Sequence, residues 1–268
     1  MASSKSDPFQ SIFAFKPHRK RHNFIFLHGF GSEYSSFKHV FKLFEKKRWS
    51  FFAFNFPGHG NNQSNSVDEL KLKHYVELVC DFIIQKRLKK VVLVGHSMGG
   101  AIAVLVNAVL RERIKALVLV APMNQTSFVV SKKRILDTLF TRSPKNQQDF
   151  IEHTDDKKSI VNFFVGAFKK RVNFKTLYSD MVQNAKYGND YLEAGYNAIK
   201  DKPTLVVLGS NDIVTPTKAS VEYLAKHSET IIFKIIDGVG HSPHYYAPKL
   251  FFDYIGEFLD NIKRNKDK

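Results

Sequence analysis

The sequence has 268 residues, of which 43% are hydrophobic, and it carries a formal net charge of +16. This length suits one large domain with a sizeable core, and the hydrophobic content argues against intrinsic disorder. No apolar run approaches the roughly 18–20 residues of a membrane span, since charges at 111–113 end the most apolar segment. The N-terminal apolar stretch is short and precedes its basic cluster, so a secretory signal peptide is not expected.

The single cysteine, Cys80, excludes an internal disulfide and, with the expected lack of a signal peptide, favours the cytoplasm. Cys80 lies in an amphipathic helical pattern, which predicts a core side chain rather than a reactive thiol. The positive charge would fit a nucleic-acid partner if it were clustered. However, the net charge of residues 124–200 is about what their length predicts. Because the charge is spread along the sequence, we expect no nucleic-acid partner and only weak attraction to anionic substrates and membrane surfaces.

Apolar runs that end in glycine-rich or polar loops recur along the chain. They cover residues 22–32, 49–60, 89–100, 114–124, 202–216 and 230–244. Helical patterns alternate with them at 67–88, 101–114, 217–227 and 248–265. Continuous apolar strands that alternate with helices predict a doubly wound, mostly parallel α/β sheet with both faces covered.

This alternation breaks between residues 124 and 200. The block contains helical patterns without a convincing strand, at 132–141, 157–168 and 172–185. It predicts a helical cap inserted into a core formed by residues 1–123 and 201–268. The phenylalanine-rich piece at 163–168 fits a greasy substrate pocket and ordinary core packing about equally well.

A serine flanked by glycines follows the third apolar run directly. The sequence Gly95-His96-Ser97-Met98-Gly99 matches G-x-S-x-G between a strand and a helix, the context of a nucleophile elbow. Such a turn needs small residues two positions to either side, and glycines stand at both. The helix that begins there directs backbone N–H groups and its positive dipole end at the site. We therefore predict that Ser97 is a nucleophile.

The developing oxyanion of such a reaction needs preorganised donors. One candidate is the backbone N–H of Met98, the residue after the nucleophile. The other is the N–H of Phe30, in the HGFG turn at 28–31 that follows the first strand. An ordinary glycine turn is the competing interpretation of this loop.

A serine hydroxyl is a weak nucleophile without a base, and the chain has 11 histidines. His241 follows the last strand and a glycine turn, which makes it the predicted base, and His244 is its main rival. The histidines in the other glycine loops are expected to orient those loops: His28, His59 and His96.

A carboxylate should fix the tautomer of His241 and stabilise its protonated form. Asp212 lies just past a strand end and is the predicted partner. Asp237 is closer to His241 in sequence but sits in the turn, where a structural role is expected, and Asp201 precedes its strand. The order Ser97, Asp212, His241 is the order of α/β-hydrolase triads.

With these motifs in place, the chain resembles the α/β-hydrolase superfamily, in the branch of small esterases, lipases and monoacylglycerol-lipase-like enzymes. HGFG, FPGHG, GHSMGG, LGSNDIVTP and GHSPH fall in family order between about residues 22 and 262. Relatives often carry Asp before the PGHG turn and Ser after it, whereas this chain has Asn55 and the sequence NNQ at 61–63. The departure bears on substrate preference more than on catalysis.

The leading hypothesis is a serine hydrolase acting on a small ester or lipid, with no metal or organic cofactor because no residue spacing matches a ligand set. The resemblance leaves open a proline iminopeptidase-like aminopeptidase or a thioesterase. Such peptidases usually need an acidic cap residue to hold the substrate amine, and several are available: Glu152, Asp155, Asp156 and Glu193. A complete predicted triad disfavours a non-catalytic binding module, and the spread charge disfavours a nucleic-acid-associated protein.

Overall fold

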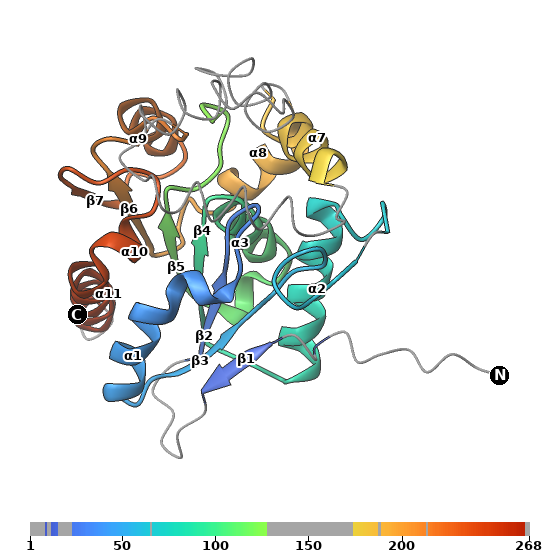
Figure 1. Cartoon of the computed structure of the whole chain (residues 1–268). Helices are drawn as coiled ribbons and strands as arrows, with labels where there is room; N and C mark the ends of the chain where they lie inside the picture. The colour runs from blue at the N-terminus through green and yellow to red at the C-terminus, as the bar shows by residue number, and fades with distance from the viewer. Residues whose placement is uncertain are drawn as a thin grey trace.

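The computed structural model has a central sheet with helices on both of its faces (Figure 1). The structure describes residue 9 and residues 12–15, 23–64, 66–127, 174–186, 189–212 and 214–265. Within these ranges the sheet has seven strands in the order β1-β3-β2-β4-β5-β6-β7. Among the strand pairs of this described sheet, only that of β1 with β3 is antiparallel, so the prediction of a mostly parallel α/β sheet is confirmed.

The predicted apolar runs form six of the strands, and the structure adds a short seventh strand as the outermost strand next to β3. The strands are β1 (Phe13–Phe15), β2 (Asn23–Leu27), β3 (Ser50–Ala53), β4 (Val91–His96), β5 (Ile114–Val120), β6 (Thr204–Gly209) and β7 (Ile232–Ile236). The sequence did not predict β1, because three residues are too few to show a strand period.

Helices connect the strands. They are α1 (Lys38–Lys46), α2 (Leu72–Gln85), α3 (Met98–Val109), α7 (Phe174–Asn184), α8 (Asp190–Asn197), α9 (Thr217–Ala225), α10 (Pro243–Tyr246) and α11 (Pro248–Arg264), with 3-10 turns η1 (Tyr34–Phe37) and η2 (Arg111–Arg113). Helix α1 was not predicted, although Val40, Phe41 and Phe44 give it a buried stripe. Among the described helices, none has both the length and the apolar character needed to cross a membrane.

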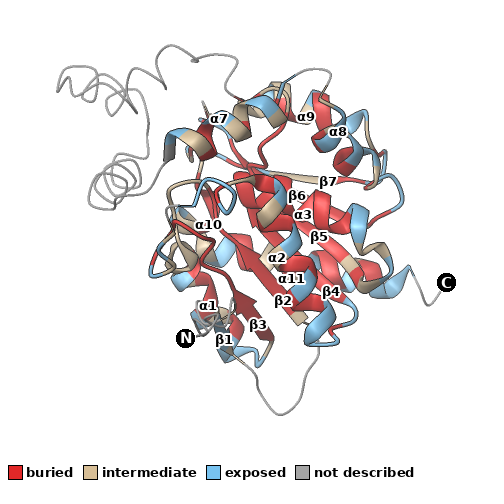
Figure 2. Ribbon diagram, turned by 90° about the vertical axis from the view of Figure 1, so that its right-hand side faces the viewer, coloured by how far each residue is buried: buried red, intermediate tan, exposed pale blue. Residues whose placement is uncertain are grey.

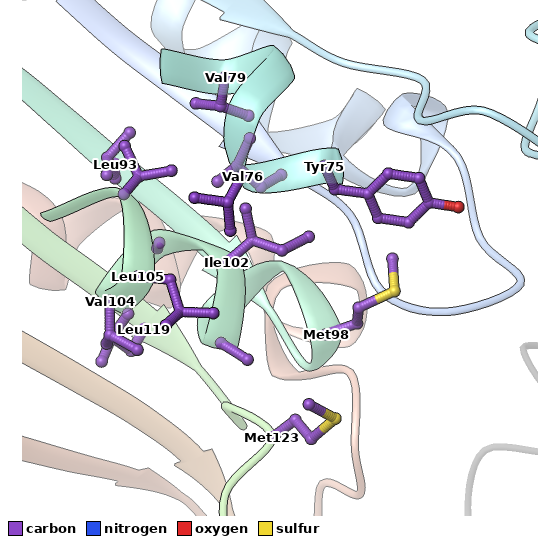
Figure 3. Close-up of a cluster of buried hydrophobic side chains, with 14 of the residues drawn as sticks. Tyr75, Val76, Val79, Leu93, Met98, Ile102, Val104, Leu105, Leu119 and Met123 are labelled. Carbon is purple, nitrogen blue, oxygen red and sulfur yellow. The ribbon is translucent and has the colours of Figure 1, made fainter. Parts of the chain in front are cut away.

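The core has two layers because successive side chains of each strand point to opposite faces of the sheet. In β2, Ile25 and Leu27 pack towards α2 and α3, whereas Phe24 and Phe26 pack towards α1 and α11. Figure 3 shows the first layer where α2 meets α3, and Figure 2 shows that the central strands are buried. Burial on both faces explains why the strands are continuous apolar runs in the sequence.

Part of the predicted insertion lies in the described residues. Helix α7 corresponds to the predicted piece at 172–185, while the pieces at 132–141 and 157–168 lie outside the described residues. In α7 the Asp180 carboxylate accepts a hydrogen bond from the Leu72 N–H (2.8 Å), at the first residue of α2. Helix α8 lies against α3, where a Cβ added to Gly195 would meet side-chain atoms of Leu105 at 3.1 Å. The last part of the predicted insertion therefore packs against α3.

Exposed basic side chains gather at the sheet edge where the parallel strands begin. The turn from α1 into β3 carries Lys46, Lys47 and Arg48, and the turn from α2 into β4 carries four more at 86, 87, 89 and 90. Helix C-termini point to this edge, and their dipoles favour nearby cations. These two turns therefore form a basic, exposed region at the end of the sheet opposite Ser97.

Candidate functional site

Ser97 lies on the sharp turn between β4 and α3. Its φ of 54° and ψ of −116° place it in a backbone region that residues with a side chain rarely occupy. The surrounding backbone holds this conformation, because the Ser97 N–H donates to the Val120 carbonyl (2.9 Å) and the Ser97 carbonyl accepts from the Met123 N–H (3.0 Å). The end of β5 and the loop after it therefore fix the turn from two sides.

The predicted need for glycine beside Ser97 has a direct steric cause. A Cβ on Gly95 would lie 2.2 Å from the carbonyl oxygen of Gly99, and a Cβ on Gly99 would lie 2.1 Å from that of Leu27. Both obstacles are backbone atoms, which cannot rotate away. The two glycines let strand, turn and helix approach closely enough for the turn to form, as the motif predicted.

His241 and Asp212 meet beyond the ends of β7 and β6. The Nδ1 of His241 lies 2.9 Å from Oδ2 of Asp212. A carboxylate can only accept, so Nδ1 carries the proton and Nε2 keeps its lone pair. Asp212 also accepts from the N–H groups of Val214 (2.8 Å) and Thr215 (2.9 Å) through Oδ1, and from the Thr215 hydroxyl (2.6 Å) through Oδ2. These bonds fix the carboxylate and, through it, the histidine tautomer.

The surroundings of Asp212 favour its ionised form. Burial raises the pKa of the Asp212 carboxyl, but the nearby His241 and the hydrogen bonds from His241 and Thr215 outweigh burial and bring that pKa below its ordinary value. The carboxylate is therefore negative at neutral pH, as it must be to stabilise a protonated His241.

The rival residues lie in other surroundings. His244 lies on α10, fully buried, with its ring centroid 4.4 Å from that of Phe37 and 4.5 Å from that of His96. Asp237 accepts a hydrogen bond from the Ser210 hydroxyl (3.0 Å), and Asp201 is exposed at the opposite edge of the sheet. Of the candidate carboxylates and histidines, Asp212 and His241 are the two that pair.

The HGFG loop lies directly beside the serine turn. A Cβ on Gly29 would come within 3.3 Å of the Ser97 Cβ. The predicted donor Phe30 follows Gly29, and the other predicted donor, Met98, is the first residue of α3. The N–H groups in the first turn of a helix have no carbonyl one turn earlier to bond, which suits Met98 to an external acceptor.

Two buried histidines hold this loop, as the sequence predicted. The Nδ1–H of His28 donates to the Gly29 carbonyl (2.8 Å), and its Nε2 accepts from the Phe56 N–H (3.2 Å). The Nε2 of His59 accepts from the Gly31 N–H (3.1 Å). Burial and the neighbouring His59 hold the pKa of His28 well below its ordinary value, so the ring stays neutral and keeps both bonds.

Asn55 stands where relatives often carry aspartate, and its side-chain amide forms hydrogen bonds with neighbouring residues. The Asn55 Oδ1 accepts from the Tyr34 N–H (2.8 Å), and its Nδ2 donates to Oδ1 of Asn61 (2.8 Å). Asn62 donates to the Asn55 carbonyl (2.8 Å). An aspartate side chain at 55 has no N–H group, so it could not donate to the Asn61 Oδ1 as Asn55 does.

Sequence reasoning missed the role of Thr215 next to Asp212. A signal was present, because Asp212 begins a short loop that ends in Thr215 and Pro216, and an aspartate in that place typically bonds the backbone N–H groups that follow it. In the described part of the chain, no group of three or more His, Cys, Asp or Glu side chains is placed to hold a metal ion.

A parallel doubly wound sheet, a strained serine between β4 and α3, and a His–Asp pair beyond two further strand ends together define the α/β-hydrolase class. The chain belongs to the family described as serine aminopeptidase, S33, whose model matches residues 18–245. It is 66% identical over 266 residues to "Putative esterase/lipase 2" of Mycoplasma genitalium, covering 99% of each chain.

Solved structures support the same fold. An esterase from Exiguobacterium antarcticum superposes with a TM-score of 0.74 at 16% identity, covering 94% of both chains. The hydrolase olei00960 from Oleispira antarctica gives a TM-score of 0.77 at 16% identity, covering 97% of this chain and 99% of the other. At such identities the likeness concerns the fold, while the curated relatives support a carboxylic ester hydrolase of the esterase/lipase type.

Proposed function

We propose that this enzyme cleaves carboxylic esters with a Ser97–His241–Asp212 triad through an acyl-enzyme. The observation that carries the proposal is the 2.9 Å hydrogen bond between His241 and the buried Asp212, at the sheet edge where Ser97 stands on its strained turn. That bond leaves the Nε2 of His241 as the proton acceptor which a serine nucleophile requires.

In the first half of the reaction, the Ser97 Oγ attacks the ester carbonyl carbon while His241 Nε2 takes the hydroxyl proton. The negative oxygen that forms accepts hydrogen bonds from the N–H groups of Met98 and Phe30. The intermediate then expels the alcohol, which leaves with the proton from His241. Ser97 keeps the acyl group as an ester.

In the second half, His241 removes a proton from water, and the resulting hydroxide attacks the acyl carbon. The same two N–H groups hold the oxyanion again. Collapse releases the carboxylic acid and returns the proton to Ser97. Water is the only co-substrate, so the proposal includes no metal or organic cofactor.

An ester substrate is favoured over a peptide amine by the state of Glu193, one of the acidic residues considered for amine binding. Glu193 accepts hydrogen bonds from the Tyr223 hydroxyl (2.8 Å) and the Gln125 side chain (2.7 Å). Its other oxygen lies 3.6 Å from Nε2 of His227. Two hydrogen bonds within the chain therefore occupy one carboxylate oxygen, and the His227 ring lies beside the other. The other acidic candidates at 152, 155 and 156 lie outside the described residues.

The proposal gives residues 124–200 the role of a cap over a core of residues 1–123 and 201–268. Its support is the position of α7, where the Tyr178 ring lies 6.1 Å from the ring of Phe30. An insertion that reaches the proposed oxyanion loop can shape the space that a small ester or lipid enters. The basic edge of the sheet lies at the opposite end of the strands, so it is not part of this proposed substrate site.

Turnover assays test the proposal. The wild-type enzyme and its Ser97→Ala variant are compared on p-nitrophenyl esters of graded acyl length, on an acyl thioester and on prolyl-naphthylamide. We expect the wild type to hydrolyse the oxygen esters fastest and Ser97→Ala to lose that activity. Ser66→Ala, at an exposed serine, is the control and should match the wild type.

Full ester turnover by a folded Ser97→Ala would overturn the proposed nucleophile. Faster cleavage of prolyl-naphthylamide than of every ester would keep the nucleophile but replace the substrate class. Preference for the thioester would likewise replace the oxygen ester.

A further inference from the structure

His96 contacts two parts of the proposed machinery at once. It ends β4, directly before Ser97, and its Nε2 lies 2.8 Å from the backbone carbonyl oxygen of His241. A carbonyl only accepts hydrogen bonds, so this nitrogen carries the ring proton. The side chain next to the proposed nucleophile therefore bonds the backbone of the proposed base, which is 145 positions away in the sequence.

The His96 ring packs between the loops of the site. It is 6% exposed, and its centroid lies 4.9 Å from that of His241 and 4.5 Å from that of His244. On the oxyanion-loop side, a Cβ on Gly29 would come within 2.9 Å of His96 Nδ1. Neighbours on these sides leave the ring little room to turn, so its hydrogen bond has a fixed direction.

The ring also remains neutral. Burial, with a further contribution from the nearby His241, lowers the pKa of His96 to about 3, although the bond to the His241 carbonyl and the charge of Asp212 act in the opposite sense. At any pH well above that pKa the ring therefore keeps a single proton, on the Nε2 that donates to the His241 carbonyl. No second positive charge arises beside His241 when it accepts the serine proton.

We propose that His96 is a positioning residue, which holds the backbone of His241 at a fixed place relative to Ser97. The base is then fixed from two sides: Asp212 holds its side chain from the β6 loop, and His96 holds its backbone from the end of β4. A displacement of about 1 Å between reacting groups can reduce the rate by about 10²-fold. This inference rests on the proposed triad.

Two substitutions of nearly equal size separate the hydrogen bond from packing. His96→Gln keeps an N–H donor near the position of Nε2, whereas His96→Met has a similar length and no donor. We expect His96→Met to lower kcat for a p-nitrophenyl ester by about tenfold to a hundredfold, with KM within about twofold of wild type. His96→Gln should recover most of that loss, because the bond to the His241 carbonyl is restored.

Two further variants are needed: a substitute in case His96→Met does not fold, and a control for the general effect of removing a histidine. If His96→Met does not fold, His96→Asn replaces it, since its shorter amide stops near the Nδ1 position and does not reach the carbonyl. His227→Met, in the turn after α9, should leave kcat unchanged. Thermal unfolding of each variant allows rates to be expressed per folded enzyme.

The outcomes separate this inference from the proposed function. If the wild type hydrolyses esters and Ser97→Ala does not, while folded His96→Met (or His96→Asn) keeps the wild-type kcat, the positioning role is wrong and the triad stands. An equal loss in His96→Met and His96→Gln also contradicts it, because the donor is then not the cause. If the wild type hydrolyses no ester, the proposed function itself fails.

Discussion

The two edges of the sheet are built in opposite ways. Where the strands end, glycines bring backbones within contact distance, Ser97 occupies a strained conformation, and the buried Asp212 carboxylate accepts hydrogen bonds at both of its oxygens. Where the strands begin, the turns carry exposed lysines and arginines. The first end holds individual side chains in fixed positions, whereas the second presents exposed positive charge beyond the C-termini of α1 and α2. Substitutions should therefore have very different consequences at the two ends of the same strands.

The largest effect is expected at Asp212. Asp212→Asn keeps the shape of the side chain but allows the wrong tautomer of His241 and removes the negative charge that stabilises its protonated form. We predict a fall in kcat of about 10³- to 10⁴-fold with little change in KM, measured on a p-nitrophenyl ester. Asp237→Asn, at the exposed neighbour of Ser210, is the control. Equal activity of the two variants would contradict the assignment of the carboxylate.

The next effect concerns the close approach at the serine turn. Gly95→Ala places a Cβ 2.2 Å from a backbone oxygen, so we expect the free energy of unfolding to fall by about 3 kcal/mol or more. Gly256→Ala in α11 is a matched control, because nothing lies within 4 Å of its added Cβ. That change should raise stability by about 0.5–1 kcal/mol through helix propensity. Urea unfolding measures the free energy of unfolding of both variants. If Gly256→Ala lost as much stability as Gly95→Ala, the close approach at Gly95 would not be the cause of the loss.

A smaller effect is expected at Thr215, whose hydroxyl bonds the Asp212 carboxylate at 2.6 Å. Thr215→Val removes one bond to the charged form, so the pKa of Asp212 should rise towards its ordinary value. A carboxyl group whose pKa is lower in the folded than in the unfolded state stabilises the fold at pH values above both pKa values. This stabilisation is lost as the pH falls through the folded-state pKa. Because Thr215→Val reduces it, the variant should unfold at a higher pH on acidification. We expect kcat to fall about fivefold through looser control of His241.

Acid unfolding, followed by circular dichroism, compares Thr215→Val with Thr230→Val at an exposed position. Identical acid midpoints for the two variants would argue against a contribution of the Thr215 hydroxyl to the charged state of Asp212.

The smallest effect is expected at the opposite edge. Replacing Lys46, Lys47, Lys86 and Lys89 by Gln removes four exposed charges far from the serine turn. We predict an unchanged kcat/KM for a neutral ester and a change in unfolding free energy within about 0.5 kcal/mol for each substitution. Steady-state kinetics and urea unfolding measure these quantities. A tenfold loss of turnover would show that the two edges are not functionally separate.

The sequence predicted the sheet and the local motifs well because both leave short-range patterns. Strands buried on two faces are continuous apolar runs, and parallel strands bring the loops at their ends to one edge. This reasoning selected Ser97, Asp212 and His241 from many candidates, and the structure brings the last two into contact. It failed for β1, whose three residues carry no period and which is defined by pairing with β3.

Long-range contacts could not be predicted in the same way. The bond from His96 to the His241 carbonyl joins two glycine loops whose spacing depends on how β4 and β7 sit in the sheet. The attachment of α8 to α3 depends on Gly195 meeting Leu105, and neither residue stands out locally. Such contacts follow from the packed fold, so they became visible only in three dimensions.

Covalent labelling of the nucleophile tests the central claim most directly. The wild-type enzyme is treated with a fluorophosphonate probe, and the modified peptide is located by mass spectrometry. The account predicts a single phosphonylated residue, Ser97, with labelling slowed in Asp212→Asn because the base loses its orientation. Labelling at another serine, or an enzyme that hydrolyses esters while Ser97 stays unmodified, would contradict it.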